Sequence, residues 1–578
     1  MRILLWVTAG FGAAMAMNAY EILPVSWYPA VLILGFFLYR IPKRRKLACI
    51  CGGMGLGFLW FSLWTALYLQ PIEKLDGVTR HLSVAVTRTE VLESGACRGE
   101  GWTLLGGRPY RIRILLKDQK PEPGDVVEGM VSLRFVKAQG SYRGHGSQTP
   151  GGFLAGTAQG ELELKPDGAK ALSYAGRLRR SILTRLDRAI PEDAAPFAKA
   201  LLLGDDNSLD SGTNQALSLS GIRHVVAVSG LHVTILCMLV SWLTLNNRWI
   251  TFPVTIPLLL VFCAVTGFTP SVTRAALMMT VAMAAPILGR DRDTLTRLAF
   301  AVYSMLLGNP MVITSVSFQL SVASVLGLLV LGKPIYNGLA RFLPRKKGIQ
   351  KTILHWLYSS VAISLGALIL VTPLTALHFG TVSLISPVTN LFTVWLIPWI
   401  FWGILLILAV SLITETGALI LGCLLAWPIR FILGMAKLMG AFPLAALYTV
   451  SVPVLIWLVM TYGVGYRYLA TRDYRPWRFL RISVLGLALA LCLSWIPPRV
   501  NTLRVTAFPD GSGPCLLLQS RGKSVLVNCG SREQARLAAD TLLSQGIHHL
   551  DCLIFTGLTG QNTGGAEAFL ERISTDRI

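Results

Sequence analysis

Two histidines and a serine stand at the start of an otherwise apolar segment. The stretch from Gly221 to Val233 contains His224, Ser229 and His232, and apolar residues follow to Leu243. Polar groups at membrane depth are costly, and they usually face a bundle interior or a water-filled path. In a helix, Ser229 and His232 would share one face, with His224 close to it. These residues therefore either line a polar path or form hydrogen bonds between helices and at the headgroup level.

Two adjacent carboxylates precede this segment. Asp205 and Asp206 follow the apolar run Leu201 to Leu203. A pair of carboxylates can bind Mg²⁺, but Asp is also a common, solvated helix cap. The ten cysteines include no CxxC pair, and Cys97 is the only cysteine between residues 71 and 172. The sequence thus predicts no zinc or redox motif, no cofactor, and no disulfide within that stretch.

Membrane-spanning helices are expected to position these residues. Of the 578 residues, 53% are hydrophobic and 14% charged, and the mean hydropathy is +0.57. A span needs about 20 mostly apolar residues. The first apolar stretch, Ile3 to Ala19, has the flanks of a signal peptide, but two more follow so closely that a transmembrane helix is favoured. About thirteen spans are predicted. They centre on residues 3–19, 31–37, 47–69, 225–243, 250–265, a third span that ends by residue 288, 298–307, 312–331, 353–377, 385–410, 418–439, 452–464 and 482–495. Residues 197–203 could form a further short or re-entrant piece.

The basic loops predict the orientation of these spans. Lys and Arg are dense at residues 43–46, 341–347 and 467–481, and short loops of this kind face the cytoplasm. The number of predicted spans between these loops places the amino terminus inside the cell. It places both residues 71–172 and the carboxy-terminal tail outside the cytoplasm. The net charge is +23, but residues 71–168 and 499–578 are nearly neutral. Because the excess lies in the spans and their loops, basicity alone is weak evidence for nucleic-acid binding.

The external segment is predicted to be β-structure. Apolar and polar residues alternate in His81 to Thr87, Tyr110 to Leu116 and Val126 to Phe135, with turn residues between them. Several short strands suggest a small OB-like barrel, a shape that often holds single-stranded nucleic acid, although a plain β-domain fits as well. The five arginines among apolar residues around Leu178 to Ile190 favour a helix on the membrane surface.

The stretch around His224 closely resembles the signature of the ComEC family of competence proteins. Further matches follow in order: Gly267, Pro270-Ser271, Arg274-Ala275, Arg290-Asp291-Arg292-Asp293, Asn309-Pro310 and Phe318 to Ser321. The resemblance implies a channel that passes one strand of DNA across the cytoplasmic membrane. In such a channel Arg274 would meet a phosphate, unless it snorkels or pairs with a carboxylate. Gln319 and Ser321 would line the path or hold helices together; Gly230 also belongs to the signature.

The tail resembles the start of a metallo-β-lactamase-like domain. In the family an aspartate stands at the position of Asn528, and a His-x-His-x-Asp-His cluster follows. Here those four positions fall on Gly557, Thr559, Gln561 and Asn562, none of which is a strong metal ligand. We therefore predict no metal site and no catalytic residues, and an enzyme is not favoured. His548 and His549 are adjacent and would point to opposite faces of a strand.

The sequence thus predicts a mainly α-helical polytopic membrane protein with an extracytoplasmic OB-like domain and a partial α/β tail. The expected parts are terminal helices (1–70), the OB-like domain (71–172), an amphipathic interfacial helix (173–195), the channel core (196–497) and the tail (498–578). The expected partners are single-stranded DNA, membrane lipid, an outer DNA receptor and an ATP-driven motor inside, because no P-loop is present. The alternatives are a transporter of another anion and a membrane-anchored metal-dependent hydrolase.

Overall fold

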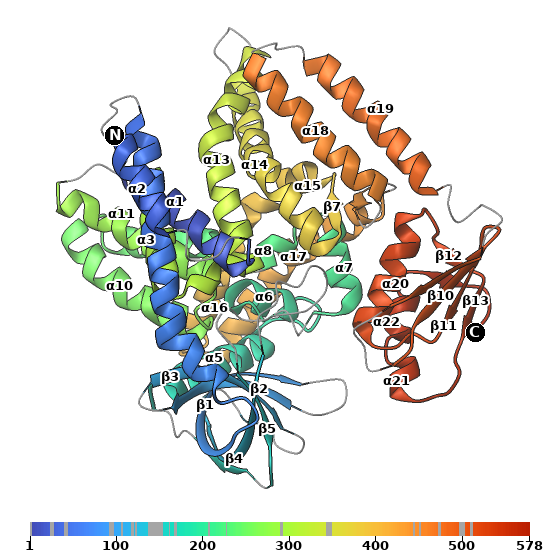
Figure 1. The fold of residues 1–578 in the computed structure, drawn as a ribbon, viewed down its shortest axis with the longest axis horizontal. Coiled ribbons are helices and arrows are strands. Elements are labelled where there is room, and N and C mark those ends of the chain that lie inside the picture. Colours follow the sequence, from blue (N-terminus) through green and yellow to red (C-terminus); the bar gives the residue numbers. More distant parts are fainter. Residues whose placement is uncertain are drawn as a thin grey trace.

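The protein consists of a bundle of helices, a β-barrel and a small carboxy-terminal domain (Figure 1). The computed structural model describes residues 3–578, except for 23–27, 40–43, 92–96, 106–107, 117–120, 122–123, 137–153, 161, 167–169, 206–208, 227, 290–292, 343–348, 443–444, 450–451, 472–475, 496–502 and 509–512.

Most of the chain is helical. Before the barrel come α1 (Ile3–Ala19), α2 (Tyr28–Tyr39), α3 (Arg45–Trp64), the π-helix η3 (Thr65–Leu69) and α4 (Gln70–Glu73). After it come α5 (Lys170–Ala189), α6 (Ala195–Leu203), α7 (Ser211–Leu219), α8 (Arg223–Val226), α9 (Gly230–Leu243), α10 (Arg248–Val265), α11 (Pro270–Ile287), α12 (Thr294–Gly308), η5 (Pro310–Thr314), α13 (Val316–Leu339), η6 (Ala340–Phe342), α14 (Ile349–Phe379), α15 (Ser386–Thr393), η7 (Val394–Leu396), α16 (Ile397–Val410), α17 (Glu415–Gly440), α18 (Val452–Thr471) and α19 (Pro476–Trp495).

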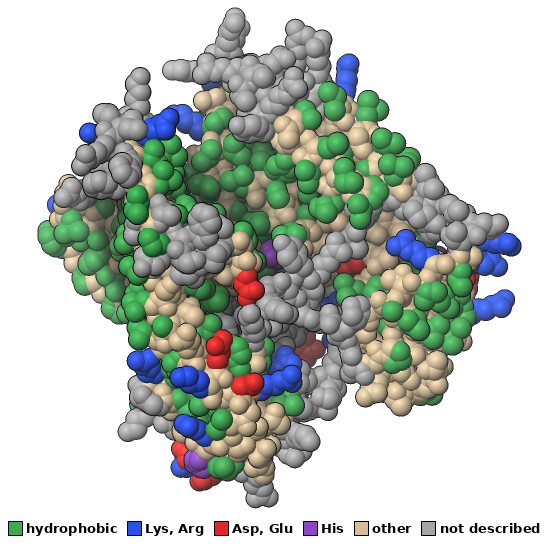
Figure 2. Space-filling view, viewed as in Figure 1, with side chains coloured by type: hydrophobic (Ala, Val, Ile, Leu, Met, Phe, Trp, Pro, Cys, Tyr) green, Lys and Arg blue, Asp and Glu red, His purple; other side chains and the backbone are tan. Residues whose placement is uncertain are grey.

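Six of these helical segments are long and apolar enough to cross a membrane: 45–73, 248–265, 316–339, 350–379, 386–410 and 415–440. Five shorter apolar helices accompany them, at residues 3–19, 230–243, 294–308, 452–464 and 481–493. Apolar side chains cover much of this part of the molecule (Figure 2). The chain is therefore a membrane protein, and thirteen spans stay a prediction.

Glycines let several helices approach closely. A Cβ added to Gly53 of α3 would stand only 2.1 Å from the carbonyl oxygen of Val7 in α1. Between α13 and α14, a Cβ on Gly327 would lie 2.4 Å from the carbonyl oxygen of Gly366. Small residues at such crossings allow backbones to pack directly, which is the usual way that membrane helices associate.

Two expected spans are interrupted. The predicted helix from Val225 to Leu243 begins only at Gly230, after the single turn of α8. The span from Ile385 to Val410 is divided into α15, η7 and α16. The short segment α6 has seven of its nine residues buried, and it measures about 14 Å at 1.5 Å per residue, too short to cross a bilayer.

Strands β1 (Thr79–Val91), β2 (Cys97–Leu105), β3 (Arg108–Leu116), β4 (Val126–Phe135), β5 (Leu154–Ala158) and β6 (Glu163–Lys165) form the barrel domain. The sheet runs β1-β2-β3-β5-β4 and closes through a β1–β4 pairing, with β6 added beside β4. Only β3 and β5 pair in parallel among the described strands of this sheet. The three strands predicted from alternation are confirmed, because apolar side chains in β1, β3 and β4 point into the barrel core.

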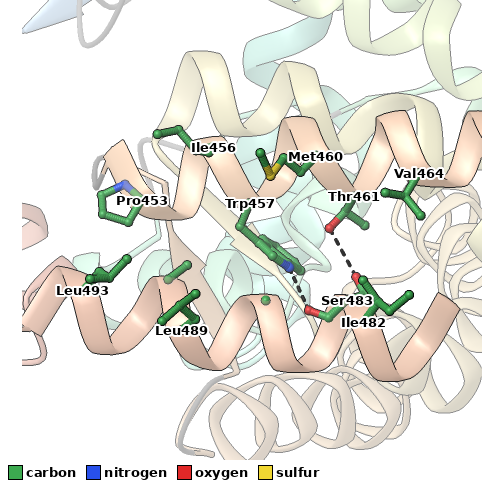
Figure 3. Close-up of a pocket in the computed structure, with 12 residues that line it drawn as sticks. Pro453, Ile456, Trp457, Met460, Thr461, Val464, Ile482, Ser483, Leu489 and Leu493 are labelled. Carbon is green, nitrogen blue, oxygen red and sulfur yellow. Dashed lines mark hydrogen bonds between the residues drawn. The ribbon is translucent and has the colours of Figure 1, made fainter. Parts of the chain in front are cut away.

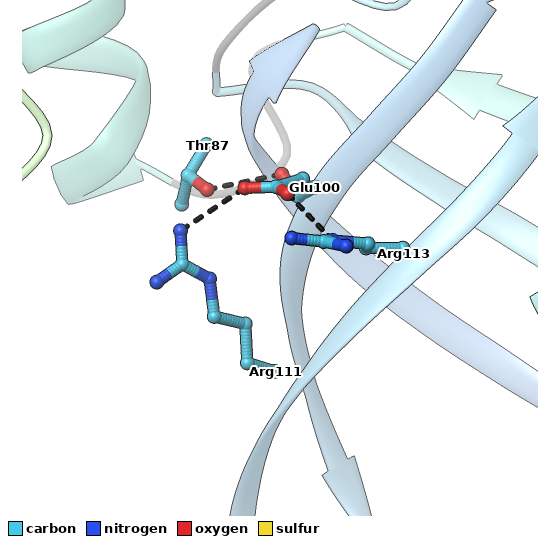
Figure 4. Close-up of polar contacts among 4 residues, drawn as sticks. All are labelled: Thr87, Glu100, Arg111 and Arg113. Carbon is cyan, nitrogen blue, oxygen red and sulfur yellow. Dashed lines mark hydrogen bonds and ion pairs between the residues drawn. The ribbon is translucent and has the colours of Figure 1, made fainter. Parts of the chain in front are cut away.

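The barrel shares its core with the helices. One buried cluster contains Ile112 and Leu133 of the barrel, Trp64 of α3, Phe11 of α1 and Leu306 of α12. On the barrel wall, Glu100 of β2 accepts hydrogen bonds from Arg111 (3.1 Å) and Arg113 (2.7 Å) of β3 (Figure 4). The Glu100 side chain is only 8% exposed, so this ion-pair network is largely desolvated.

Helix α5 connects the barrel to the bundle. Leu186 and Ile190 at its end are buried in the bundle core, and the helix packs against α6, α10, α16 and α17. Arg179 donates hydrogen bonds to the carbonyl oxygens of Leu203 (3.0 Å) and Val265 (3.2 Å), which end α6 and α10. Cations at helix carboxyl ends are favourable. The apolar side of α5 therefore faces protein, while its position at the membrane surface stays a prediction.

The tail is a small α/β unit. Its sheet has the order β13-β11-β10-β9, from β9 (Arg504–Ala507), β10 (Leu516–Ser520), β11 (Lys523–Val527) and β13 (Cys552–Ile554). Helices α20 (Arg532–Ser544), α21 (Gly560–Thr563) and α22 (Ala566–Leu570) accompany it, and β12 (His549–Leu550) pairs with β14 (Ser574–Thr575). A separate short pair, β7 (Thr381–Ser383) and β8 (Ala446–Tyr448), lies within the bundle part of the chain.

Candidate functional site

The turn before α8 is anchored to distant parts of the bundle. Gly221 has φ +78°, and a Cβ there would stand 2.4 Å from Cβ of Ser386. Both the backbone conformation and the lack of space therefore require glycine at this position. Ser386 Oγ donates to the carbonyl oxygen of Gly221 (3.3 Å), and Ser383 Oγ donates to that of Leu219 (2.8 Å). Sequence reasoning missed both serines, since nothing near them in the chain marks this contact.

Ser229 and His232 form a reciprocal cap at the start of α9. The backbone N–H of Ser229 donates to His232 Nδ1 (2.9 Å), while Ser229 Oγ accepts from the N–H of Leu231 (3.3 Å). Because Nδ1 is an acceptor, a neutral ring carries its proton on Nε2. Nδ1 is thus unavailable as a base for the Ser229 hydroxyl, although the two lie 3.3 Å apart. The pair orders a helix terminus and is not arranged for nucleophilic chemistry.

His232 is completely buried and faces the bundle. Its ring lies 5.4 Å from that of Phe401 in α16, centroid to centroid. Its Nε2 has no hydrogen-bond partner among the residues that the structure describes. His224 lies elsewhere: it is exposed, and its Nδ1 is 3.0 Å from the carbonyl oxygen of Gly221. The expectation that His224 lies close to the face of Ser229 and His232 is wrong, because α8 and α9 are separate helices.

Arg274 is a buried cation without a counter-charge in the described part of the chain. It lies in the second turn of α11 and is 4% exposed. Its Nε and Nη1 have no hydrogen-bond partner there, and neither do the hydroxyls of Thr269 and Thr273 nearby in sequence. Nη2 faces the first turn of α9, since a Cβ on Gly230 would stand 3.2 Å from it.

This arrangement favours an anion. A helix amino terminus carries partial positive charge, and its free N–H groups attract phosphate or carboxylate. Placing a guanidinium beside it, in a desolvated setting, is costly unless negative charge is bound between them. The structure thus brings Ser229, Gly230 and Arg274 together, whereas His232 points toward α16.

Gln319 and Ser321 hold helices together. Gln319 Nε2 donates to Tyr20 Oη (2.9 Å), and its Oε1 lies 2.8 Å from His378 Nε2. Ser321 Oγ lies 2.9 Å from Ser271 Oγ, which links α13 to α11. Tyr20 and His378 were not predicted as part of this network, because Tyr20 directly follows α1 and His378 lies near the end of α14, far apart in sequence.

The remaining signature residues serve local structure where they are described. Asp205 pairs with Arg179 at 3.6 Å. The cap of α7 is Asp210, whose carboxylate accepts from the N–H of Thr213 (2.8 Å). Asn309 caps η5 through the N–H of Met311 (3.0 Å), and Pro310 opens that turn. Asp206, Arg290 and Asp291 lie outside the described residues.

The tail loop in which the sequence resemblance places the family's metal ligands has side chains that bond to one another. Asn528 exchanges two hydrogen bonds with Thr556, both at 2.9 Å. Asn562 donates to the carbonyl oxygen of Gly557 (3.2 Å), and its own carbonyl accepts from the N–H of Cys529. No group of three or more His, Cys, Asp or Glu able to hold a metal occurs among the described residues.

A cavity of about 320 Å³ lies between α18 and α19 (Figure 3). Its walls are almost wholly apolar, including Trp457, Met460 and Leu489. Trp457 Nε1 donates a hydrogen bond to the carbonyl oxygen of Ser483 (2.8 Å), so the indole N–H of this wall is already bonded within the protein. Such a lining suits hydrocarbon and not a charged strand.

The chain is similar to competence proteins. The family model described as Competence protein matches residues 201–473. Competence protein ComA of Neisseria gonorrhoeae is 26% identical over 65% of this chain and 52% of its own length. ComE operon protein 3 of Bacillus subtilis is 29% identical over 69% and 53%, and the uncharacterized protein YcaI of Escherichia coli is 23% identical over 90% and 69%. The chain thus spans about half the length of the first two relatives. No solved structure matches it.

Proposed function

Because this chain belongs to the ComEC family of competence proteins, we propose that it passes single-stranded DNA across the bacterial cytoplasmic membrane during natural transformation. The single observation that carries this proposal is the buried guanidinium of Arg274, which lies beside the first turn of α9 and whose Nε and Nη1 have no hydrogen-bond partner among the described residues. An ionisable group at membrane depth usually serves a ligand or ion path. A phosphodiester supplies the negative charge that this guanidinium lacks.

The barrel supports the same function. Its strand order, with β3 and β5 parallel and the remaining barrel pairs antiparallel, is what we expect of an OB-type barrel. We propose that it lies outside the cytoplasm, with the amino terminus inside and the tail outside, as the basic loops predict. There the barrel would receive the DNA strand from a surface receptor. An ATP-driven motor in the cytoplasm would drive the strand inward. Ser321 and Gln319 would hold the helices beside the path.

Replacing Arg274 tests the proposal. In a transformable host whose own copy is deleted, the R274A protein is expected to lower the transformation frequency about tenfold or more, because hydrogen bonds to charged groups contribute roughly 1.5–3 kcal/mol. R274K is expected to recover only part of the transformation frequency, since a lysine cannot present the planar guanidinium group with its paired N–H donors. DNA held at the cell surface in a nuclease-sensitive form should be unchanged.

The matched control is R248A, which removes an arginine at the exposed start of α10. Membrane levels of each variant are measured by immunoblot. Transformation by R274A at the level of R248A, with equal protein in the membrane, would contradict the role of Arg274 in DNA passage.

An anion transporter of another kind is the second candidate, since Arg274 would suit any anion. Uptake of labelled inorganic phosphate and of a labelled oligonucleotide into liposomes that contain the full chain separates the two. Uptake of phosphate alone would favour this alternative. A metal-dependent hydrolase gains no support from the tail loop, whose side chains bond to one another.

A further inference from the structure

An exposed stripe of leucines runs along α3 and η3. Leu56, Leu59, Leu63 and Leu67 follow one another at intervals of three or four residues, which places them on one side of the helix. Each is 46–48% exposed. The segment 45–73 is long and apolar enough to cross a membrane, so an exposed apolar face on it is a lipid-facing surface. We call these four residues the leucine stripe.

The leucine stripe ends at the level of the lipid headgroups. Helix α3 begins at Arg45, and a basic residue at the end of a span lies at the membrane surface. At 1.5 Å per residue, Leu67 is about 33 Å along the helix from Arg45, whereas the hydrocarbon layer is about 30 Å thick. The rings of Trp64 and Tyr68 stack here at 5.2 Å, and both residue types are favoured at membrane interfaces. Leu67 therefore lies near the membrane surface opposite to Arg45.

The hairpin of β2 and β3 is attached to the span at this depth. Arg108 Nη1 donates a hydrogen bond to the carbonyl oxygen of Leu67, and Tyr68 Oη donates one to the carbonyl oxygen of Pro109 (3.3 Å). The rings of Tyr68 and Tyr110 lie 4.9 Å apart, centroid to centroid. Figure 1 shows β3 beside the end of the span that leads into the barrel. The start of β3 therefore lies at the same depth as the end of the leucine stripe.

The hairpin carries exposed apolar side chains next to this attachment. Trp102 and Leu104 flank the buried Thr103 on β2, so both point out of the barrel, and they are 41% and 71% exposed. Leu104 pairs with Pro109 across the two strands. Because Pro109 is bonded to Tyr68, the outer face of the hairpin continues the leucine stripe.

We propose that the β2–β3 hairpin lies in the headgroup layer of the membrane, where Trp102 and Leu104 contact the acyl chains of phospholipids. Apolar side chains at this depth lose their contact with water, as those of an interfacial helix do. Arg108 is exposed, and a guanidinium has further N–H donors beyond the one bonded to Leu67, which suits a lipid phosphate. This contact holds the barrel against the bilayer, whatever the protein transports.

Two observations favour lipid over a nucleic-acid strand on this face. Arg111, the cross-strand neighbour of Trp102, is already paired with the carboxylate of Glu100 at 3.1 Å. The attachment to Leu67 also places the hairpin at headgroup depth. A polyanion is therefore expected on another face of the barrel.

The test introduces one photoreactive residue, p-benzoylphenylalanine, into the full chain in nanodiscs of phosphatidylcholine. Irradiation joins this residue to the molecules beside it, and mass spectrometry identifies the adduct. At position 104 we expect about fivefold or more lipid adduct than at position 130, because an apolar side chain in the headgroup layer meets acyl chains. Position 56, in the leucine stripe, is the positive control and should also give lipid adduct.

Met130 is the matched control because it is 44% exposed and points outward from β4. Its cross-strand neighbour is His81, and the ion pair of Glu128 with Lys165 lies on the same strand pairings, so polar groups surround it. The melting temperature of each labelled chain is compared with that of the unchanged protein. If the label at position 104 lowers it, the same comparison is made with the label in place of Trp102, an aromatic residue of similar size.

Equal lipid adduct at positions 104 and 130 would overturn the membrane contact of the hairpin. Absence of lipid adduct at position 56 would overturn it too, because the leucine stripe would then not face lipid. An adduct at position 104 with a second copy of the chain, or with added oligothymidylate, in place of lipid would assign this face to protein or nucleic acid and likewise contradict the proposal.

Discussion

The guanidinium of Arg274 rests against the backbone of Gly230. The space between them is so small that a Cβ on Gly230 would stand 3.2 Å from Nη2, and it would also lie 3.4 Å from Cβ of Ala275. Glycine at the first position of α9 therefore fixes how near the cation comes to the helix terminus. Changes at either residue should affect anion binding before they affect the fold.

Replacing Gly230 by alanine should lower transformation without unfolding the protein. The added methyl group pushes the guanidinium away, while alanine is favoured over glycine in a helix by roughly 0.5–1 kcal/mol, which offsets the crowding. Transformation frequency and melting temperature are compared with those of G434A, since a Cβ on Gly434 of α17 meets nothing within 4 Å. Unaltered transformation by G230A would show that this spacing has no functional role.

Two adjacent glycines of α3 should respond in opposite directions. G53A places a methyl group 2.1 Å from a backbone oxygen of α1 and should destabilise the protein by about 1–3 kcal/mol or more. G52A points into open space and should stabilise the helix slightly. Thermal unfolding in detergent measures both. Equal melting temperatures would contradict the close packing of α1 on α3.

The Glu100 network should be sensitive to loss of its charge. E100Q removes the charge that Arg111 and Arg113 share on the barrel wall, and loss of hydrogen bonds to a charged group costs about 1.5–3 kcal/mol. The control is E128Q, because Glu128 pairs with Lys165 on the barrel surface and little change is expected there. A melting temperature for E100Q that equals that of E128Q would contradict this prediction.

The two buried thiols of the tail should resist alkylation. Burial raises the pKa of Cys515 and Cys529 to about 12. At pH 8 such a thiol is ionised about one part in ten thousand, against about a quarter for a free cysteine of pKa near 8.5. Site-resolved mass spectrometry after iodoacetamide treatment should show labelling roughly a thousandfold slower in the native protein than in urea.

The same thiols make the stability of the tail depend on pH. Their folded pKa lies above the unfolded value, so above pH 8.5 the unfolded chain binds fewer protons than the folded one. Their contribution is fully present below about pH 8.5, and it is lost progressively as the pH rises toward 12. Urea denaturation between pH 7 and 10.5 should show this decline, which the double variant C515A/C529A should lack.

Hydrophobic patterning was sufficient to predict most helices. An apolar segment of about twenty residues in a membrane must hydrogen-bond its own backbone, and a helix does so within the segment. Patterning failed where the chain changes direction within the bundle. The helix expected to start at Val225 starts at Gly230, since Ser229 and His232 cap it in a way that the usual Ser-to-Glu spacing does not reveal. Strands β7 and β8 have three residues each, too few for a period to appear.

The candidate site was predictable in its residue types but not in its contacts. The position of Arg274 near the start of a span follows from sequence, whereas its approach to Gly230 depends on how α9 and α11 pack. Ser383 and Ser386 hold the Gly221 turn from more than 160 residues away in the sequence. Contacts of this kind depend on tertiary packing, which no local pattern encodes.

The shared core of barrel and helices limits how this protein can be recombined. Side chains of β3 and β4 are buried in one cluster with Phe11, Trp64 and Leu306. A barrel cut out between residues 79 and 165 would lose the ring contact of Tyr110 with Tyr68, whose centroids lie 4.9 Å apart, and the rest of this cluster. A chimaera that borrows the barrel should therefore also borrow the segment that carries Trp64 and Tyr68.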